Sequence, residues 1–344
     1  MTPSKPASAL TYRASGVDLD AAQAVKSRIA GIVSTTHGPE VLAGVGSFGA
    51  MYGLAGYDEP VLVSSTDGVG TKLKIAALVG RFDTLGEDLV NLCVNDIIVS
   101  GAKPLFFLDY IAVGELDQRV IEDLVGGMAR ACREVGCALI GGETAQMPGV
   151  YNEGELDLAG FVVGAVEKSA IKDFSEISDG DILVGIPSTG LHTNGYSLVR
   201  HALGLDDDPS PLREHYAELD GTLADALLAP HRSYYRDLGP VFSLVKSAAH
   251  ITGGGLPENM PRVLPEGLAA RFDTTAWKLS PVFSVLQEMA EIEPDEMFRV
   301  FNMGLGMVLV CDKKAAAEVM SGISDAAVVG EVGTAEDERR VILE

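Results

Sequence analysis

One short segment of the chain carries a carboxylate, two glycines, a hydroxyl and an ammonium within six residues. Glycines let backbone N–H groups approach an anion, a lysine pairs with phosphate oxygens, and a carboxylate binds Mg²⁺. An apolar run at 61–63 precedes the segment and a helix-compatible run at 73–78 follows it. The pattern predicts a phosphate and metal site at a strand end, although a polar turn between a strand and a helix has a similar composition. The residues assigned to this site are Asp67, Gly68, Gly70, Thr71 and Lys72.

A second carboxylate lies on the apolar face of a predicted helix. Thr84 and Glu87 have the spacing of a capping box, which predicts that a helix begins there. Apolar residues repeat with helical spacing along 85–93, and the next position in that series is Asp96. A carboxylate at such a position is costly unless it is paired or binds a metal. We assign Asp96 and its neighbour Asn95 to the site; a structural Asp that caps a loop or pairs with a basic residue is the alternative.

Further carboxylates and glycines follow other predicted strands. A buried strand at 137–140 ends in a small loop with a carboxylate, and such strand ends are the usual place for a site in an α/β domain. Asp109 interrupts a predicted strand at 105–113 and is either a third metal-side carboxylate or an ordinary buried Asp. The segment 44–53 contains four glycines and is interpreted as a phosphate lid, with a plain loop as the alternative. The residues assigned from the first loop are Gly141, Gly142 and Glu143.

The second half of the chain contains two loops in which glycine and hydroxyl residues precede a predicted helix. Backbone N–H groups at the start of a helix favour an anion. His192 lies in the first of these loops and is a candidate to bind phosphate or move a proton, although a lone loop histidine is more often incidental. The residues assigned to these two loops are Gly190, His192, Thr193, Asn194, Thr252, Gly253 and Gly254.

These residues are distributed over a chain of 344 residues, a length that favours two domains over one core. Strands are predicted at 156–168 and 181–186, and helices after a cap at Asp117 and around 231–246, before a glycine-rich loop that begins at His250. This alternation predicts an α/β architecture of the α+β type. We expect a mobile arm at 1–15, a first domain at 16–173 that binds nucleotide, and a second domain at 174–344 that binds substrate.

Charge and cysteine content restrict the possible partners and compartment. The net charge of −23 argues against binding to nucleic acid, whose phosphates need a basic surface. The four cysteines form no C-x-x-C pair and lie in apolar surroundings, as expected of buried thiols in a reducing compartment. No apolar run reaches the roughly 20 residues of a membrane helix, and the N-terminus lacks a signal-peptide core. A cytoplasmic protein without membrane contact is therefore expected.

The order of the motifs resembles the phosphoribosylformylglycinamidine cyclo-ligases, also called aminoimidazole ribonucleotide synthetases, of purine biosynthesis. Each motif is weak alone, but their number and order are specific, and the resemblance runs from about residue 12 to the end of the chain. The segments that carry it are 66–72, 93–96, 104–110, 141–145, 192–200, 227–230, 250–255 and 258–265.

The resemblance implies a homodimer in which the N-terminal sheets of two subunits pair. It implies that ATP, with Mg²⁺ and K⁺, binds in the first domain near the dimer interface. It also implies that formylglycinamidine ribonucleotide is phosphorylated on its formyl amide oxygen and closes to 5-aminoimidazole ribonucleotide, with release of ADP and phosphate. In this assignment the catalytic residues are Lys72, Asp96 and His192, and the metal ligands are Asp67, Asp96 and Glu143.

Two functions of other kinds fit parts of the same pattern. A kinase acting on a stable acceptor would need the same phosphate and metal residues and would differ in its product. A nucleotide-sensing dimer without catalysis would keep the glycine-rich loops but would not need Lys72 or the carboxylates, which are present. Selenophosphate synthetases carry a reactive cysteine near the first glycine-rich segment, and residues 40–56 contain none.

Overall fold

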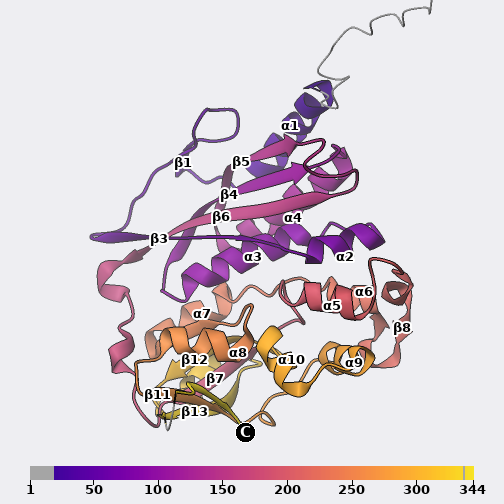
Figure 1. Cartoon of the computed structure of the whole chain (residues 1–344). Coiled ribbons are helices and arrows are strands. Elements are labelled where there is room, and N and C mark those ends of the chain that lie inside the picture. The colour runs from indigo at the N-terminus through magenta and orange to yellow at the C-terminus, as the bar shows by residue number, and fades with distance from the viewer. Residues whose placement is uncertain (1–18, 336–337) are drawn as a thin grey trace, which may run out of the picture.

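The computed structural model describes residues 19–335 and 338–344, and the arm predicted at 1–15 lies outside the described residues. Two sheets form the frame, one from each half of the chain, with helices between and around them (Figure 1). This arrangement confirms the predicted α+β class, while the domain boundary at 173/174 stays a prediction. Within the described residues, no helix is long and apolar enough to cross a membrane.

The first sheet has four strands, and antiparallel pairing dominates it. The two outer strands are β3 and β5, and only the β4–β5 pair is parallel. The register places Asp67, Gly160 and Asp109 in one row across the sheet. In spatial order the strands are β3 (Pro60–Gly68), β6 (Leu156–Glu167), β4 (Lys103–Val113) and β5 (Ala138–Gln146).

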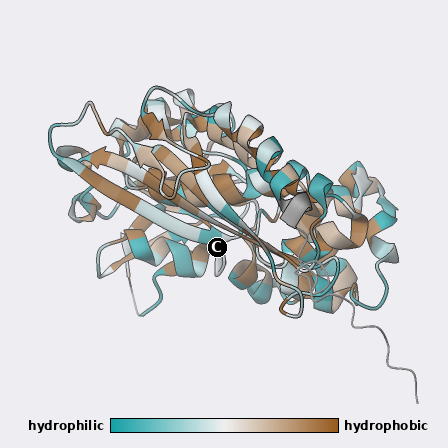
Figure 2. Cartoon of the chain, turned by 90° about the horizontal axis from the view of Figure 1, so that it is seen from above, coloured by the Kyte–Doolittle hydropathy of each residue, from teal (hydrophilic) through white to brown (hydrophobic). Residues whose placement is uncertain are grey.

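Helices cover one face of this sheet. The apolar stripe predicted for α3 is buried: Leu85 and Leu89 have no exposed surface. Asp117 caps α4 by accepting a hydrogen bond from the Arg119 N–H at 2.8 Å, as its spacing predicted. Figure 2 shows brown, apolar stretches along the strands. The helices of this half are α1 (Leu19–Ser34), α2 (Lys72–Val79), α3 (Leu85–Ile98) and α4 (Gln118–Val135), and a short pair of strands, β1 (Val41–Ala43) and β2 (Met51–Tyr52), brackets the glycine-rich segment.

The second sheet has six strands and is antiparallel except for the β11–β14 pair. Its order is β10 (Val245–His250), β12 (Leu305–Cys311), β7 (Ile182–Pro187), β13 (Ala327–Thr334), β11 (Leu268–Phe272) and β14 (Val341–Leu343). A two-residue pair, β8 (His215–Tyr216) and β9 (Gly221–Thr222), lies outside it. The helices of this half are α5 (Tyr196–Ala202), α6 (Leu223–Leu227), α7 (Tyr235–Val241), α8 (Gly255–Asn259), α9 (Pro281–Ala290), α10 (Pro294–Val300) and α11 (Ala316–Gly322).

The loop predicted at 141–143 is part of a strand, so this prediction was wrong, whereas the first predicted site does lie at a strand end. Strand β3 continues to Gly68, and only 69–71 form the turn before α2. Strand β5 continues through Gly141, Gly142 and Glu143 and pairs with β4. Pairing with neighbouring strands outweighs the low strand propensity of glycine at these positions.

Two helix predictions also need correction. Thr84 makes no side-chain capping bond and instead donates to a backbone carbonyl of the second half, while Glu87 forms an ion pair with an arginine of α4. The helix predicted around 231–246 is limited to α7. Residues 231–234 precede it as an irregular segment, and 245–250 form strand β10 because they pair with β12.

Candidate active site

Asp67 and Asp96, two of the predicted metal ligands, lie near each other where the two halves meet. Ser65 Oγ donates to Asp96 Oδ2 at 3.0 Å, and His250 Nδ1 lies 2.8 Å from Asp96 Oδ1. Asp67 follows Ser65 by two residues, so both face the same side of β3. Burial raises the pKa of Asp67, the Gly68 N–H bond opposes that shift, and the charge of Asp96 adds to it. The pair supplies the carboxylate oxygens that Mg²⁺ prefers.

Glu143 does not join this pair, which corrects the predicted three-carboxylate metal site. Asp67 lies on β3 and Glu143 on β5, at opposite edges of the four-stranded sheet. Three strand spacings separate their backbones by roughly 14 Å. Within 19–335 and 338–344, no three His, Cys, Asp or Glu side chains are grouped closely enough to hold a metal ion.

Lys72 is also placed differently from the prediction. Its ammonium has no exposed surface, forms an ion pair with Asp88 at 2.7 Å and donates to Ala229 O at 2.8 Å. Burial lowers the pKa of Lys72 and raises that of Asp88, and their mutual attraction opposes both shifts. Since both partners are buried, this ammonium holds the segment that begins at Ala229 and is not presented to a phosphate.

Helix α3 holds the next residues of that segment through a row of polar side chains. Asp88 Oδ1 accepts from the His231 N–H at 2.7 Å, and Asn91 Nδ2 donates to His231 O at 2.7 Å. Asn95 donates to Arg232 O at 2.8 Å and accepts from the Tyr234 N–H at 3.0 Å. The predicted nucleotide contact of Asn95 is therefore replaced by a contact between the two halves of the chain, because both ends of its amide are engaged.

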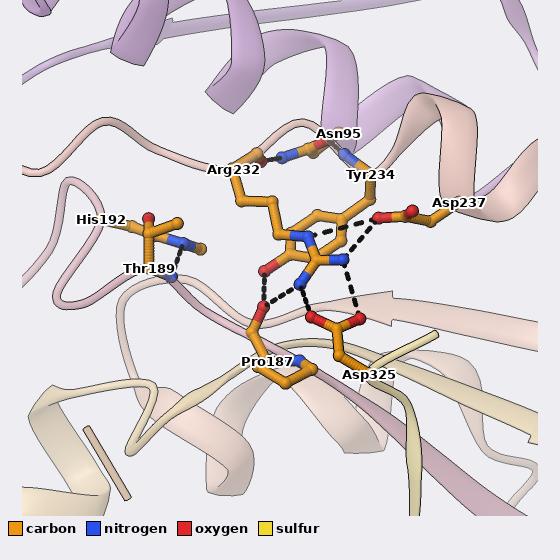
Figure 3. Close-up of polar contacts among 8 residues, drawn as sticks. All are labelled: Asn95, Pro187, Thr189, His192, Arg232, Tyr234, Asp237 and Asp325. Carbon is orange, nitrogen blue, oxygen red and sulfur yellow. Dashed lines mark hydrogen bonds and ion pairs between the residues drawn. The ribbon is translucent and has the colours of Figure 1, made fainter. Parts of the chain in front are cut away.

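Arg232 fixes the same segment from the opposite side (Figure 3). Its guanidinium forms ion pairs with Asp237 at 2.9 Å and Asp325 at 2.6 Å. It also donates to Pro187 O at 3.2 Å, and the Tyr234 hydroxyl donates to that oxygen at 2.9 Å. Because Pro187 ends β7, these bonds fix the start of the loop that carries His192.

The His192 ring is buried and held in a defined orientation. The Thr189 N–H donates to His192 Nε2 at 3.2 Å, so the ring proton resides on Nδ1. The His192 backbone has a φ of 60°, an unfavourable conformation for a residue with a Cβ. Burial lowers the pKa of His192 well below its ordinary value. A side chain on Gly306 would lie 2.7 Å from the His192 ring, so glycine is required there for the ring to fit.

The two predicted substrate loops of the second half come together. A Cβ added to Gly253 would lie 3.1 Å from Asn194 Oδ1, which shows how closely these loops approach. The Thr71 hydroxyl lies 3.0 Å from Ser197 Oγ, so the turn before α2 reaches the start of α5. Gly190 O accepts from an asparagine at 302, and Thr252 bonds to one at 259. The structure thus gathers Gly190, His192, Thr193, Asn194, Thr252, Gly253 and Gly254 opposite Gly68, Gly70 and Thr71.

A second region, which we call the sheet-edge pocket, lies between α1, β5 and the glycine-rich segment 44–49. Its cavity of about 800 Å³ is lined by Asp109, Gly142, Glu143 and Lys26, among others. Burial, and to a smaller extent the charge of Glu143, raise the pKa of Asp109 to about 7. A Cβ on Gly142 would overlap the Asp109 carboxylate, so this glycine makes room for it.

The sequence did not identify His231, His250, Asp88 and Asn91 as site residues. His231 and His250 lie on elements that were predicted as a helix and a loop, and their contacts with the first half join residues 140 and 154 positions apart. The one available signal was the spacing of Asp88, Asn91 and Asn95, which puts a polar row on an otherwise apolar helix. Together the two halves join the partly exposed carboxylates of the site to buried imidazoles and amides.

Comparison with known proteins supports the same assignment. The family described as AIR synthase related protein matches with its N-terminal domain over residues 49–166 and its C-terminal domain over 178–344. A phosphoribosylformylglycinamidine cyclo-ligase of Xanthomonas euvesicatoria pv. vesicatoria is 50% identical, covering 96% of this chain and 99% of the relative. One from Carboxydothermus hydrogenoformans is 48% identical, covering 97% of this chain and 98% of the relative.

Solved structures with much lower sequence identity share the fold. A hydrogenase maturation protein HypE in complex with ATP aligns with a TM-score of 0.63 at 17% identity, covering 92% of this chain and 90% of the other. A thiamine-monophosphate kinase from Stenotrophomonas maltophilia aligns with a TM-score of 0.62 at 17% identity, covering 92% and 95%. At this identity the likeness establishes the architecture alone.

Proposed function

The chain belongs to the AIR synthase related protein family, and from that membership we propose that it is a phosphoribosylformylglycinamidine cyclo-ligase. The observation that carries the proposal is the identity of about half of all residues, over nearly the full chain, to enzymes of that name. The enzyme closes the imidazole ring of 5-aminoimidazole ribonucleotide from formylglycinamidine ribonucleotide, with conversion of ATP to ADP and phosphate. This reaction belongs to purine biosynthesis.

The chemistry requires activation of an amide oxygen. In our proposal the formyl amide oxygen takes the γ-phosphoryl group of ATP, and ADP leaves. An amidine nitrogen of the same molecule then attacks the activated carbon and loses a proton, and phosphate departs with the former amide oxygen. Holding both reacting ends of one molecule together contributes up to about 7–11 kcal/mol in favourable cases.

The residues gathered between the two halves support a division of labour. We propose that Gly190, Thr193 and Asn194 bind the substrate beside His192, and that Thr252, Gly253 and Gly254 bind its ribose 5′-phosphate. Asp67 and Asp96 would hold Mg²⁺, which neutralises phosphate charge when bound. Lys72 would act through Asp88 and the 229–231 segment as a positioning residue. ATP and K⁺ complete the proposed requirements.

The sheet-edge pocket is proposed to receive another part of the nucleotide. Its glycine-rich segment 44–49 would close over ATP, and Glu143 would contact the nucleotide or its metal apart from the Asp67 and Asp96 pair. The cavity volume and the neighbouring Lys26 support this placement. Four free, buried cysteines support a reducing, cytoplasmic location.

A homodimer is proposed from the face of the first sheet that its helices leave uncovered. Leu62 is 61% exposed on β3 and Phe161 is 44% exposed on β6, and a second copy of this face would bury both. We expect sedimentation of the wild type as a dimer and of Phe161→Glu as a monomer. The matched change Phe174→Glu, on an exposed residue of the other half, would keep the dimer. A monomeric wild type would exclude the proposed assembly.

The activity is tested by mixing the purified chain with formylglycinamidine ribonucleotide, ATP, Mg²⁺ and K⁺. Equal amounts of ADP and the diazotisable amine of aminoimidazole ribonucleotide are expected. Asp96→Asn should lower kcat/KM by about 100-fold, because it weakens the proposed site for the Mg²⁺ that would stabilise charge on the transferring phosphoryl group. The exposed control Asp179→Asn should match the wild type. ADP without the amine would instead indicate a kinase or an uncoupled ATPase.

A further inference from the structure

Three buried histidine rings form one cluster between the two halves of the chain. The rings of His192 and His231 stack with their centroids 3.9 Å apart and an interplanar angle of 20°. His231 Nε2 lies 3.1 Å from His250 Nε2, with centroids 5.2 Å apart. His231 is therefore the central member, and it contacts both neighbours through different surfaces of its ring.

With neutral rings, only one set of hydrogen-bond directions satisfies the row from Thr193 through His231 and His250 to Asp96. Since the Asp96 carboxylate accepts, His250 carries its proton on Nδ1 and presents a lone pair at Nε2. His231 must then donate from Nε2, which leaves a lone pair at its Nδ1. The Thr193 hydroxyl lies 3.5 Å from that Nδ1 and can donate to it. Every donor in this row thus points from the substrate loop toward Asp96.

The His231 backbone is fixed by the other half of the chain. Its N–H and C=O are both bonded to α3, through Asp88 and Asn91 at 2.7 Å each. Lys72 binds Asp88 and the carbonyl of Ala229, two residues earlier. The ring therefore takes its place only when the two halves are docked, and its position follows that of α3.

We propose that His231 is a positioning residue whose Nε2–H holds the ring of His250 in place beside Asp96. In this role it joins Asp96, on α3, to the substrate loop 190–194 of the second half. The effect on rate rests on the proposed function, because ring closure is the assayed reaction. The tautomer of His250 can be read without any turnover.

Two variants of His231 separate its contacts. H231F keeps a flat ring for the stack on His192 but has no donor for His250. H231Q keeps an N–H at the corresponding distance from the backbone but loses the stack. The matched control is H215F, which makes the same change at an exposed histidine.

The tautomers are read from long-range ¹H–¹⁵N spectra of protein labelled at its six histidines, with His250→Gln to assign His250. In the wild type we expect the His250 proton on Nδ1 and the His231 proton on Nε2. In H231F we expect His250 to keep its proton on Nδ1, which Asp96 fixes, but its Nε2 signal to shift because the hydrogen bond to it is lost. We also expect a kcat lower by about 10- to 100-fold, the usual loss when a partner that orients a working group is removed. In H231Q we expect the Nε2 signal of His250 to stay near its wild-type position and kcat to recover most of that loss, with KM for both substrates unchanged.

The opposite tautomers in the wild type would overturn the proposal without any variant, even if H231F fails to fold. An H231F protein with the wild-type His250 signal and wild-type kcat would also overturn it, as would an H231Q protein as impaired as H231F. A wild type that closes no imidazole ring would reject the proposed function alone, and the His250 signals would still decide the role of His231.

Discussion

Two sites of the molecule are built in opposite ways. One is the interdomain cluster, formed by Asp96 with His250, His231 and His192, and the other is the sheet-edge pocket around Asp109. In the cluster, Asp96 is bonded to Ser65 and His250, and the nearby backbone of His231 is bonded to α3. In the pocket, Asp109 faces glycines and Glu143 across an open cavity. Folding alone fixes the cluster, whereas the pocket leaves its carboxylates for a ligand to organise.

The largest expected effect comes from breaking the buried pair behind the cluster. Lys72→Met leaves Asp88 as an unpaired charge without exposed surface, so we expect the free energy of unfolding to fall by about 3–5 kcal/mol. The exposed change Lys168→Met should stay within about 0.5 kcal/mol of the wild type. Urea unfolding measures both. If Lys72→Met lowered the free energy of unfolding by less than about 1 kcal/mol, the value for a surface ion pair, the Lys72–Asp88 pair would not support the cluster.

A smaller loss is expected from Asn91, which bonds the backbone of His231. Asn91→Ala leaves the buried His231 carbonyl without this donor, and we expect a loss of about 1–3 kcal/mol in the same assay. Asn91→Leu is the matched control, because it restores the volume of the side chain and not the hydrogen bond. Recovery of stability in the Leu variant would show that a cavity causes the loss, and that the hydrogen bond from Asn91 to the His231 carbonyl contributes little.

Much of the fold follows from local sequence patterns. The apolar runs of β4, β6 and β7 and the capped helix α4 were predicted close to their observed bounds. Strand β10 was missed because its sequence, with two alanines, is compatible with a helix, and its pairing with β12 decides its conformation. The glycines of β5 suggested a loop, and pairing with β4 decides their conformation instead.

The candidate site was predicted less completely. Asp67 and Asp96 were recognised because a carboxylate beside glycines, or on an apolar stripe, is anomalous within its own element. Lys72 was also recognised, because it is a charged residue beside glycines. The sequence does not indicate, however, that its partner is Asp88, on the next helix. The histidine cluster depends on how the two halves dock, and no local pattern encodes that contact.

The smallest effect tests the pocket through the pH dependence of stability. The folded state raises the pKa of Asp109 from 3.8 to about 7, so it holds the proton more tightly than the unfolded chain. The resulting stabilisation is fully present below about pH 4 and is lost as pH rises to about 7. Asp109→Asn removes this titration and should flatten the fall in unfolding free energy over that interval, measured by urea unfolding at several pH values. If Asp109→Asn kept the slope, Asp109 would not be its source, and the pocket would hold its carboxylates as firmly as the cluster does.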